Sequence, residues 1–240
     1  MILNKFLSAI GFISLALFCV EQAHAQQEQQ VKTEIQKKLG ANAKVKSVTP
    51  APVSGLYEVL VGNDIFYTDA GAKYIIQGEI IELASGKNIT EQRQADLNRI
   101  KWSDLTPANA IKNVRGNGSR QLAVFSDPNC GYCKRLEKSL QQLDNVTIYT
   151  YLIPILSPDS AQKAKQIWCS ADPYKTYIDW MVNGIAPNGK GDCSAPLDKN
   201  MAFAKTYGIT GTPTLFFTDG SRFPGAVQIT DIEKKFSSLK

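Results

Sequence analysis

The stretch Cys130-Gly131-Tyr132-Cys133 contains the residues of this chain whose types and spacing point most directly to chemistry. The apolar run 122–125 precedes it and predicts a buried strand, and a helical pattern follows it. A helix start offers unpaired N–H groups and the positive end of the helix dipole, and both stabilise a thiolate. We therefore expect thiol–disulfide chemistry, with Cys130 as an exposed nucleophile and Cys133 as the resolving sulfur one turn inside.

Two other interpretations of this pair stay open. A zinc site needs a second close pair of ligands, whereas the remaining candidates, Cys169 and Cys193, lie far apart in the sequence. A purely structural Cys130–Cys133 disulfide would close a very short ring and contribute little loop-closure entropy. The dithiol interpretation needs no metal and no cofactor, and we predict neither.

Cys169 and Cys193 belong to no Cys-x-x-Cys motif. Trp168 and Tyr174 indicate a partly buried helix around Cys169, and the composition of residues 184–196 is typical of a loop. We expect a structural disulfide that closes a loop of about 25 residues and stabilises the fold by about 3 kcal/mol in the chain-entropy model. A second redox-active pair is the alternative.

The N-terminus has the pattern of a secretory signal peptide. A positive Lys5 precedes the apolar run 6–20, which is short for a membrane span, and Ala23-His24-Ala25 is an A-x-A cleavage site. We expect residues 1–25 to be removed and the mature chain to begin at Gln26. An uncleaved anchor is the alternative, and a lipoprotein site is disfavoured because a bulky phenylalanine precedes the first cysteine.

Cleavage would change the chemical inventory of the chain. It would remove Cys19 and the single histidine, His24, and leave an even number of cysteines, as disulfides in an exported protein require. Without histidine, Ser-His or Cys-His hydrolysis and His-ligated metal sites are excluded. The net charge of +5 is mild and the lysines are scattered, so we interpret them as solvated surface and expect no nucleic-acid partner.

The first part of the mature chain predicts a helix and a small antiparallel sheet. Residues 26–40 have helical spacing, and short segments broken by glycine turns follow at 45–48, 56–61, 65–68, 73–77 and 79–83. So small a unit buries a thin core, and such a unit often gains stability by pairing with a copy of itself. The polar stretch 88–105 predicts an exposed helix that joins two domains.

The second part predicts a strand, the Cys-x-x-Cys helix, a second strand at 147–153, a helical insertion over 155–205, two strands and a final helix. This βαβ-then-ββα order is thioredoxin-like. In that fold a cis-proline faces the cysteines, so Thr212-Pro213 is the candidate substrate-binding step, where backbone pairs with an extended client. A trans-proline in an ordinary loop is the alternative.

The fold class is therefore α+β. We expect a signal peptide over 1–25, an N-terminal dimerisation domain over 26–86, a linker helix over 87–107 and a thioredoxin-like catalytic domain over 108–240. In thioredoxin a buried carboxylate is expected near the strand position that Val124 occupies in this chain. The acid nearest to that position here is Asp127. Asp127 is interpreted as a turn residue.

With these pieces placed, the chain resembles the periplasmic disulfide isomerases of the DsbC/DsbG family, and the DsbC branch more closely. The resemblance rests on residues 55–59 and 74–78 of the first domain, on Cys130-Gly131-Tyr132-Cys133, and on Gly211-Thr212-Pro213. It implies a V-shaped homodimer joined through the N-terminal domains, with a cleft for misfolded exported proteins. It also implies that the membrane reductase DsbD keeps the thiols reduced.

The expected activity is isomerisation or reduction of wrong disulfides, together with chaperone action. Reduced Cys130 would attack a client disulfide, and Cys133 would release a stalled client. Gly131 and Tyr132 would contact the client beside Thr212 and Pro213. A DsbA-type oxidase is one rival, although a dimerisation module argues against it. A holdase chaperone with a minor redox role is the other.

Overall fold

The computed structural model describes residues 22 and 25–239. The predicted signal peptide and its cleavage site therefore lie outside the described residues, apart from Gln22 and Ala25. The chain divides into two compact units, and the division falls between Leu97 and Asn98. Within the part of the chain that is described, no helix is long and apolar enough to cross a membrane.

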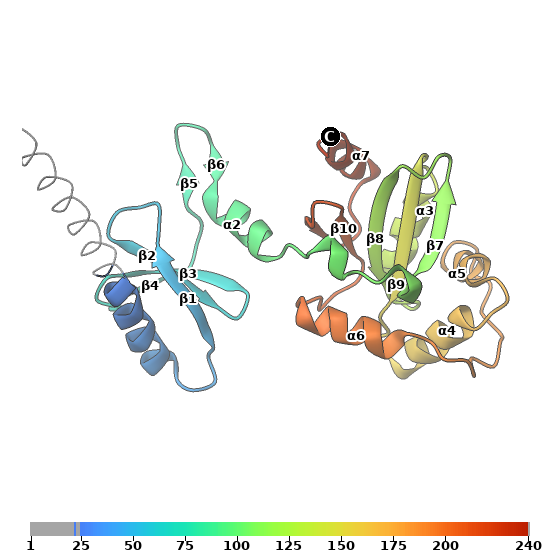
Figure 1. Cartoon of the computed structure of the whole chain (residues 1–240), viewed down its shortest axis with the longest axis horizontal. Coiled ribbons are helices and arrows are strands. Elements are labelled where there is room, and N and C mark those ends of the chain that lie inside the picture. The colour runs from blue at the N-terminus through green and yellow to red at the C-terminus, as the bar shows by residue number, and fades with distance from the viewer. Residues whose placement is uncertain (1–21, 23–24, 240) are drawn as a thin grey trace, which may run out of the picture. The chain divides into compact units, whose positions relative to one another are not determined.

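Unit 1 packs one helix on an antiparallel sheet (Figure 1). Residues 25–39 are helical, close to the predicted span, and Val31 and Ile35 are buried against strand residues Val45 and Val59. The strand order is β1-β2-β3-β4, and every neighbouring pair is antiparallel. The strands are β1 (Val45–Pro50), β2 (Leu56–Val61), β3 (Asp64–Asp69) and β4 (Ile75–Ile76).

A separate hairpin follows this sheet. The sequence predicted residues 79–83 as one of its strands, and this is wrong, because β5 (Ile81–Glu82) pairs only with β6 (Lys87–Asn88). The base of the hairpin is attached to β3 through a buried bond of 2.6 Å between the Tyr67 and Thr90 hydroxyls. That attachment directs the chain away from the sheet edge and into the next helix.

The helix predicted over residues 88–105 is shorter in the structure. Helix α2 (Ile89–Leu97) ends at the boundary of unit 1. Beyond it, Ile100 and Leu105 are buried in the core of unit 2, and the Ile100 N–H donates to the Gly220 carbonyl at 3.0 Å. The end of the expected linker is therefore part of unit 2, because its few apolar side chains are used for packing there.

Unit 2 is built on a mixed five-stranded sheet in the order β11-β10-β8-β9-β7 (Figure 1). Only the β8–β9 pair is parallel. Two short 3₁₀ turns, at Trp102–Asp104 and Pro107–Asn109, precede the sheet. The strands are β7 (Ile111–Arg115), β8 (Arg120–Ser126), β9 (Val146–Leu152), β10 (Thr214–Phe217) and β11 (Arg222–Pro224). The helices are α3 (Gly131–Leu140), α4 (Pro158–Trp168), α5 (Pro173–Met181), α6 (Leu197–Thr206) and α7 (Ile229–Ser237).

Strand β8 is buried on both faces, as its continuous apolar sequence predicts. Leu122 and Val124 pack with α3 and α7, whereas Ala123 and Phe125 pack with α6. This two-sided packing holds the end of β8 at Ser126, where the chain turns toward the Cys-x-x-Cys helix. The site is therefore attached to a strand whose last five residues are buried.

The helical insertion between β9 and β10 consists of α4, α5 and α6, in agreement with the sequence pattern. Ser157 and Asp172 cap the first two helices by accepting the N–H groups of Ser160 and Lys175, and a proline opens each helix.

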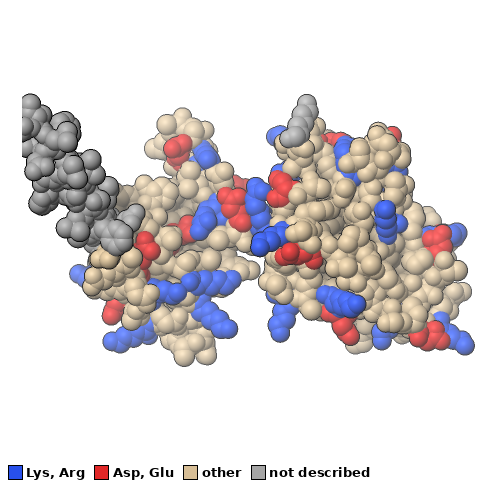
Figure 2. Space-filling view, viewed as in Figure 1, with Lys and Arg blue, Asp and Glu red and all other residues tan. Residues whose placement is uncertain are grey.

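The surface charges are mixed in sign. On the face drawn in Figure 2, lysine and arginine are interspersed with aspartate and glutamate.

Candidate active site

The loop between β8 and α3 is organised by Asp127, which is completely buried. One carboxylate oxygen accepts the N–H of Asn129 at 2.8 Å, and the other accepts the N–H of Leu156 at 3.0 Å. The Asp127 carbonyl accepts the N–H of Cys130 at 3.0 Å. Asp127 is thus a turn residue, and it also attaches the loop to the segment that follows β9.

Cys130 is the N-cap of α3, and both Cys130 and Cys133 are free thiols. The Cys130 Sγ accepts the backbone N–H of Cys133 at 3.3 Å, and the Cys130 thiol donates to the carbonyl of Thr212 at 3.2 Å. The structure therefore brings together the helix start, the first sulfur and the Thr212–Pro213 step, which lie 82 residues apart in sequence.

Both cysteines are covered. Cys130 is 5% exposed and Cys133 is 2% exposed, so the predicted exposure of Cys130 is wrong for this state of the site. The Thr212 carbonyl lies against the sulfur and helps to cover it. Burial raises the pKa of Cys133 to about 12, although a hydrogen bond from the Ser126 side chain acts in the opposite direction. Cys133 is therefore a protonated thiol at neutral pH.

The Thr212–Pro213 peptide bond is cis, as the sequence context predicts. The Pro213 carbonyl accepts the N–H of Gly225 at 2.8 Å, which attaches this loop to the residues after β11. A groove of about 250 Å³ runs along the loop. Its lining includes Gly211, Thr212, Pro213 and Arg222. The groove shares Thr212 with the contact to the Cys130 sulfur.

Gly131 and Tyr132 form the outer surface of the motif. A side chain at Gly131 would meet no atom within 4 Å, so the space beside the first sulfur is open. Tyr132 is 61% exposed, and the Arg135 guanidinium lies 5.3 Å from the centre of its ring. An exposed aromatic ring next to the first sulfur offers apolar area for contact with another molecule.

A tryptophan that the sequence analysis did not single out supports the other side of the loop. The Trp180 indole N–H donates to the Pro128 carbonyl at 2.6 Å, and the Lys134 ammonium lies 3.5 Å from the ring centre. Lys163 lies over the same ring at 5.0 Å. Nothing in the local sequence around Trp180 indicates this contact, because α5 meets the loop only in the folded chain.

Buried polar side chains of Ser126, Tyr177 and Glu137 lie in the region of Cys133. The hydroxyls of Ser126 and Tyr177 are 2.9 Å apart, and Tyr177 is 1% exposed. Glu137, one turn beyond Cys133 on α3, is 3% exposed. Burial raises the pKa of Glu137 to about 7, and the positive charge of Arg115 opposes that rise. The spacing of Glu137 from Cys133 was visible in the sequence, but its burial was not.

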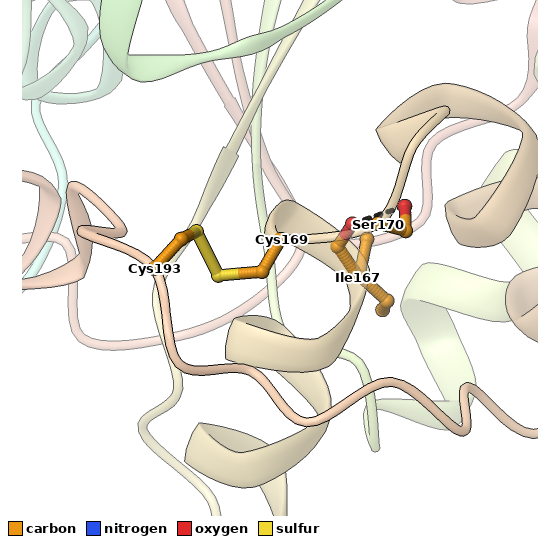
Figure 3. Close-up of a disulfide and its surroundings, with 4 residues drawn as sticks. All are labelled: Ile167, Cys169, Ser170 and Cys193. Carbon is orange, nitrogen blue, oxygen red and sulfur yellow. Dashed lines mark hydrogen bonds between the residues drawn. A yellow bond between two sulfur atoms is a disulfide. The ribbon is translucent and has the colours of Figure 1, made fainter.

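Cys169 and Cys193 form a disulfide with an S–S distance of 2.03 Å (Figure 3). Cys169 is the residue that ends α4, and Cys193 lies in the loop that leads to α6. Next to Cys169, the Ser170 hydroxyl donates to the Ile167 carbonyl at 2.8 Å. The bond connects two parts of the helical insertion, and it occupies the sulfurs that a four-cysteine zinc site would need.

The fold and the dithiol place this chain among the thioredoxin-like proteins that carry a Cys-x-x-Cys at the start of a helix. Family models agree with both halves. A thioredoxin-like domain model matches residues 107–240, and a model for the disulfide bond isomerase protein N-terminal domain matches residues 22–91.

Similar proteins and a solved structure show which family within this class the chain resembles. A probable thiol:disulfide interchange protein DsbC of Bordetella avium is 40% identical over 194 residues, which cover 81% of this chain and 69% of that protein. The probable DsbC of Bordetella pertussis is 42% identical over 75% of this chain, and the aligned region spans 64% of the relative's length. The crystal structure of a disulfide interchange protein from Neisseria gonorrhoeae is 39% identical, has a TM-score of 0.53, and matches over 56% of this chain and 97% of that one. The chain belongs to the DsbC family of thiol:disulfide interchange proteins.

Proposed function

We propose that this chain is a protein disulfide isomerase and reductase that rearranges wrong disulfides in exported proteins. The observation that carries the proposal is the free dithiol at the start of α3, whose first sulfur is aligned with the Thr212–Pro213 loop in a chain of this family. A reduced pair fits isomerisation or reduction, because an enzyme must present a thiol before it can attack a client disulfide.

Cys130 is the nucleophile in this proposal. Its thiolate attacks one sulfur of a client disulfide, forms a mixed disulfide and releases the other client sulfur as a thiolate. A second client thiolate then attacks the client sulfur of the mixed disulfide and forms a new client disulfide. Cys130 leaves as a thiolate, so the net number of electrons in the enzyme is unchanged. The N–H of Cys133 and the helix start favour negative charge on Cys130, whereas burial keeps Cys133 protonated.

The client-binding residues are Gly131, Tyr132, Thr212 and Pro213. The open space at Gly131 admits a client backbone, and the exposed Tyr132 ring offers apolar area. The groove along Thr212 and Pro213 suits an extended segment, which would displace the Cys130 thiol from the Thr212 carbonyl as it forms the mixed disulfide. The Cys169–Cys193 disulfide is structural and holds the helical insertion together.

A homodimer through the N-terminal domain, residues 26–86, completes the proposed enzyme. Strand β4 is only two residues long, and both Ile75 and Ile76 are exposed, at 48% and 45%. Tyr74 is 71% exposed and Leu83 is 94% exposed. The exposed edge strand β4 and the exposed apolar side chains of the same unit favour pairing with a second copy of the chain. Such pairing would cover both the strand edge and the apolar area.

The proposed location is the periplasm, with a mature chain from Gln26. The support is the A-x-A sequence that precedes Gln26, together with an N-terminal pattern typical of export. In that compartment the clients are misfolded or wrongly crosslinked exported proteins, and the membrane reductase DsbD is the proposed electron donor. We infer these partners from the resemblance to the family.

The proposal is tested with the full chain and a scrambled protein that contains several disulfides. Recovery of client activity should require Cys130, and Cys130→Ala should abolish it. Cys133→Ala should retain slow isomerisation and accumulate mixed disulfides, because release by ring closure is lost. The thiol state of Cys130 and Cys133, trapped in freshly lysed cells, separates isomerase from oxidase. Mostly oxidised thiols, or full recovery by Cys130→Ala, would overturn the proposal in favour of an oxidase or a holdase.

A further inference from the structure

A buried carboxylate lies one helical turn beyond the second cysteine. Glu137 follows Cys133 by four residues on α3, so the two side chains project from the same face of the helix. Both are buried. The positive charge of Arg115 acts on the Glu137 carboxyl, but burial outweighs it and favours the neutral form. A carboxylate with so little access to water is costly, and its position needs a physical explanation.

Strand β7 contributes polar side chains on the face that packs against α3 and α5. The Arg115 guanidinium donates to the Leu140 carbonyl of α3 and, at 3.1 Å, to the Tyr174 hydroxyl of α5. Asn113 lies two residues away on the same face of the strand. Its side-chain nitrogen is buried and has no hydrogen-bond partner among the described residues. The layer between β7, α3 and α5 therefore contains several polar groups, of which the Asn113 nitrogen is buried.

A hydroxyl pair connects this layer with Cys133. The Ser126 side chain lowers the pKa of the Cys133 thiol, against the larger effect of burial, and the Ser126 hydroxyl lies 2.9 Å from the hydroxyl of Tyr177. Burial raises the pKa of Tyr177 well above 10, and the charges of Glu137 and Cys133 raise it further. The charges of both groups thus act on Tyr177, and its hydroxyl contact with Ser126 makes it a candidate polar link between them.

The chemistry of Cys133 requires a proton acceptor. With a pKa of about 12, the buried thiol holds its proton, yet only a thiolate attacks a disulfide. We propose that Glu137 accepts the Cys133 proton when Cys133 resolves the mixed disulfide between Cys130 and a client, with Ser126 and Tyr177 as the polar link. This inference rests on the proposed function, and it adds a role for a carboxylate on the catalytic helix itself.

The step balances without another reactant. The proton leaves the Cys133 sulfur and reaches the Glu137 carboxylate, which becomes a neutral carboxylic acid. The electron pair left on Cys133 forms the bond to the Cys130 sulfur, and the bond between Cys130 and the client sulfur breaks. The client leaves as a thiolate with that bonding pair. The client sulfur is reduced and the Cys133 sulfur is oxidised, whereas Cys130 stays at the disulfide level throughout.

The charged and titratable groups around Glu137 come from three elements. Arg115 acts on it from β7, Tyr177 lies near it on α5, and Cys133 precedes it on α3. Tyr174 of α5 accepts a hydrogen bond from the Arg115 guanidinium. Arg115 remains positive throughout, and Tyr177 remains neutral. Burial sets the Glu137 pKa at about 7, so its carboxylate becomes available as the pH rises through neutrality. A proton acceptor is most effective when its pKa lies near the working pH.

The test follows one turnover of the reduced full chain with an aromatic disulfide whose thiolate product is coloured. Attack by Cys130 releases the first coloured thiolate in a phase that depends on reagent concentration. Attack by Cys133 releases the second in a concentration-independent phase. During this second phase Cys130 is already in a mixed disulfide, so its own ionisation no longer contributes. The rates of both phases are measured from about one unit below to one unit above pH 7 for wild type, Glu137→Gln and Glu137→Asp.

In wild type, the second phase should accelerate as the pH rises through about 7. In Glu137→Gln, this acceleration should disappear, and at the upper end of the pH range the phase should be at least about tenfold slower, while the first phase is unchanged. Glu137→Asp should restore part of the pH dependence, and Tyr177→Phe should slow only the second phase. The exposed Asp198→Asn is the matched control and should behave as wild type.

Two results would overturn the inference. One is a second phase in Glu137→Gln with the wild-type rate and pH profile. The other is an equal slowing of both phases in Glu137→Gln and Glu137→Asp, which would mean that Glu137 only maintains the fold. Failure of the proposed isomerase function is separate, because it would appear as loss of client recovery in wild type while both phases of the small-reagent reaction remain intact.

Discussion

At the scale of single residues, the two sulfurs of the motif differ because they occupy different ends of one helical turn. Cys130 is the N-cap and accepts the N–H of Cys133 at 3.3 Å. Cys133 lies inside the helix, where burial raises its pKa to about 12. Burial therefore keeps the Cys133 thiol protonated, whereas the Cys130 sulfur accepts a backbone N–H at the start of the helix.

This difference predicts the order of alkylation. With a small excess of iodoacetamide near neutral pH, Cys130 of the reduced protein should be modified first and Cys133 only after unfolding. Peptide mass mapping at short reaction times measures the distribution. Because Cys130 is only 5% exposed, its rate should rise when the Thr212 loop is displaced by a bound peptide. Labelling of Cys133 before Cys130 would reverse the assigned roles.

Glu137 predicts a pH-dependent stability. Burial raises its folded pKa to about 7, above the unfolded value near 4.5, so the folded state binds the proton more tightly. The stability is therefore largest below the unfolded pKa, and it falls as the pH rises toward the folded pKa, by about 3 kcal/mol in total. Glu137→Gln should remove this fall, as urea unfolding at several pH values can measure. If the variant and wild type lose stability in parallel, the carboxylate is not the group responsible.

At the scale of secondary-structure elements, the site depends on what holds the ends of β8 and α3. Asp127 attaches the loop between them to Leu156, and the Trp180 indole of α5 donates to Pro128 in the same loop. The helical insertion thus supports the dithiol from the side. The Cys169–Cys193 disulfide in turn connects the end of α4 with the loop before α6.

The disulfide should stabilise this insertion without taking part in exchange. Replacing both Cys169 and Cys193 by serine should lower the free energy of unfolding by about 3 kcal/mol, because the unfolded chain regains the entropy of an open loop. The rates of the small-reagent reaction at Cys130 should not change. Mild reductant on wild type should free two thiols per chain, as thiol titration will show. Four thiols freed at one potential would make the second pair redox-active.

At the scale of the whole molecule, the proposed enzyme needs two copies of the chain. Unit 1 has a thin core, and its β4 strand exposes Ile75 and Ile76. In a two-fold dimer, these positions would be covered by the partner's equivalent surface, and a client would meet two dithiols. Isomerisation would benefit, because a client thiol released from one site could re-form its bond at the other.

A pair of charges on this strand should separate the copies. Ile75→Asp with Ile76→Asp should convert a dimer into a monomer in sedimentation experiments, because like charges would be buried against each other. The small-reagent reaction should keep its rate, whereas recovery of a scrambled client should fall several-fold. Lys37→Asp, at an exposed helix position of the same unit, is the control and should remain dimeric. A wild-type chain that sediments as a monomer would contradict the dimeric mechanism.

Local sequence patterns were sufficient for most elements of this fold. Helical spacing predicted residues 25–39, continuous apolar residues predicted β8, and the Cys-x-x-Cys spacing predicted a dithiol at the start of α3. The placement of the 79–83 strand in the main sheet and the length of the linker helix were wrong. In both cases the segment contacts a residue that is distant in the sequence. Thr90, just after the hairpin, binds the Tyr67 hydroxyl, and Ile100, after the end of α2, binds the Gly220 carbonyl.

The sequence by itself thus determined which groups react and on which element they lie, because residue type and periodicity are local properties. Only the tertiary structure decided the environment of those groups. The Thr212 carbonyl covers Cys130 from 82 residues away, and Tyr177 and Arg115 reach the region of Glu137 from other elements. Burial, hydrogen bonding and charge set the reactivity of a thiol or carboxyl, and all three depend on neighbours that the fold alone brings together.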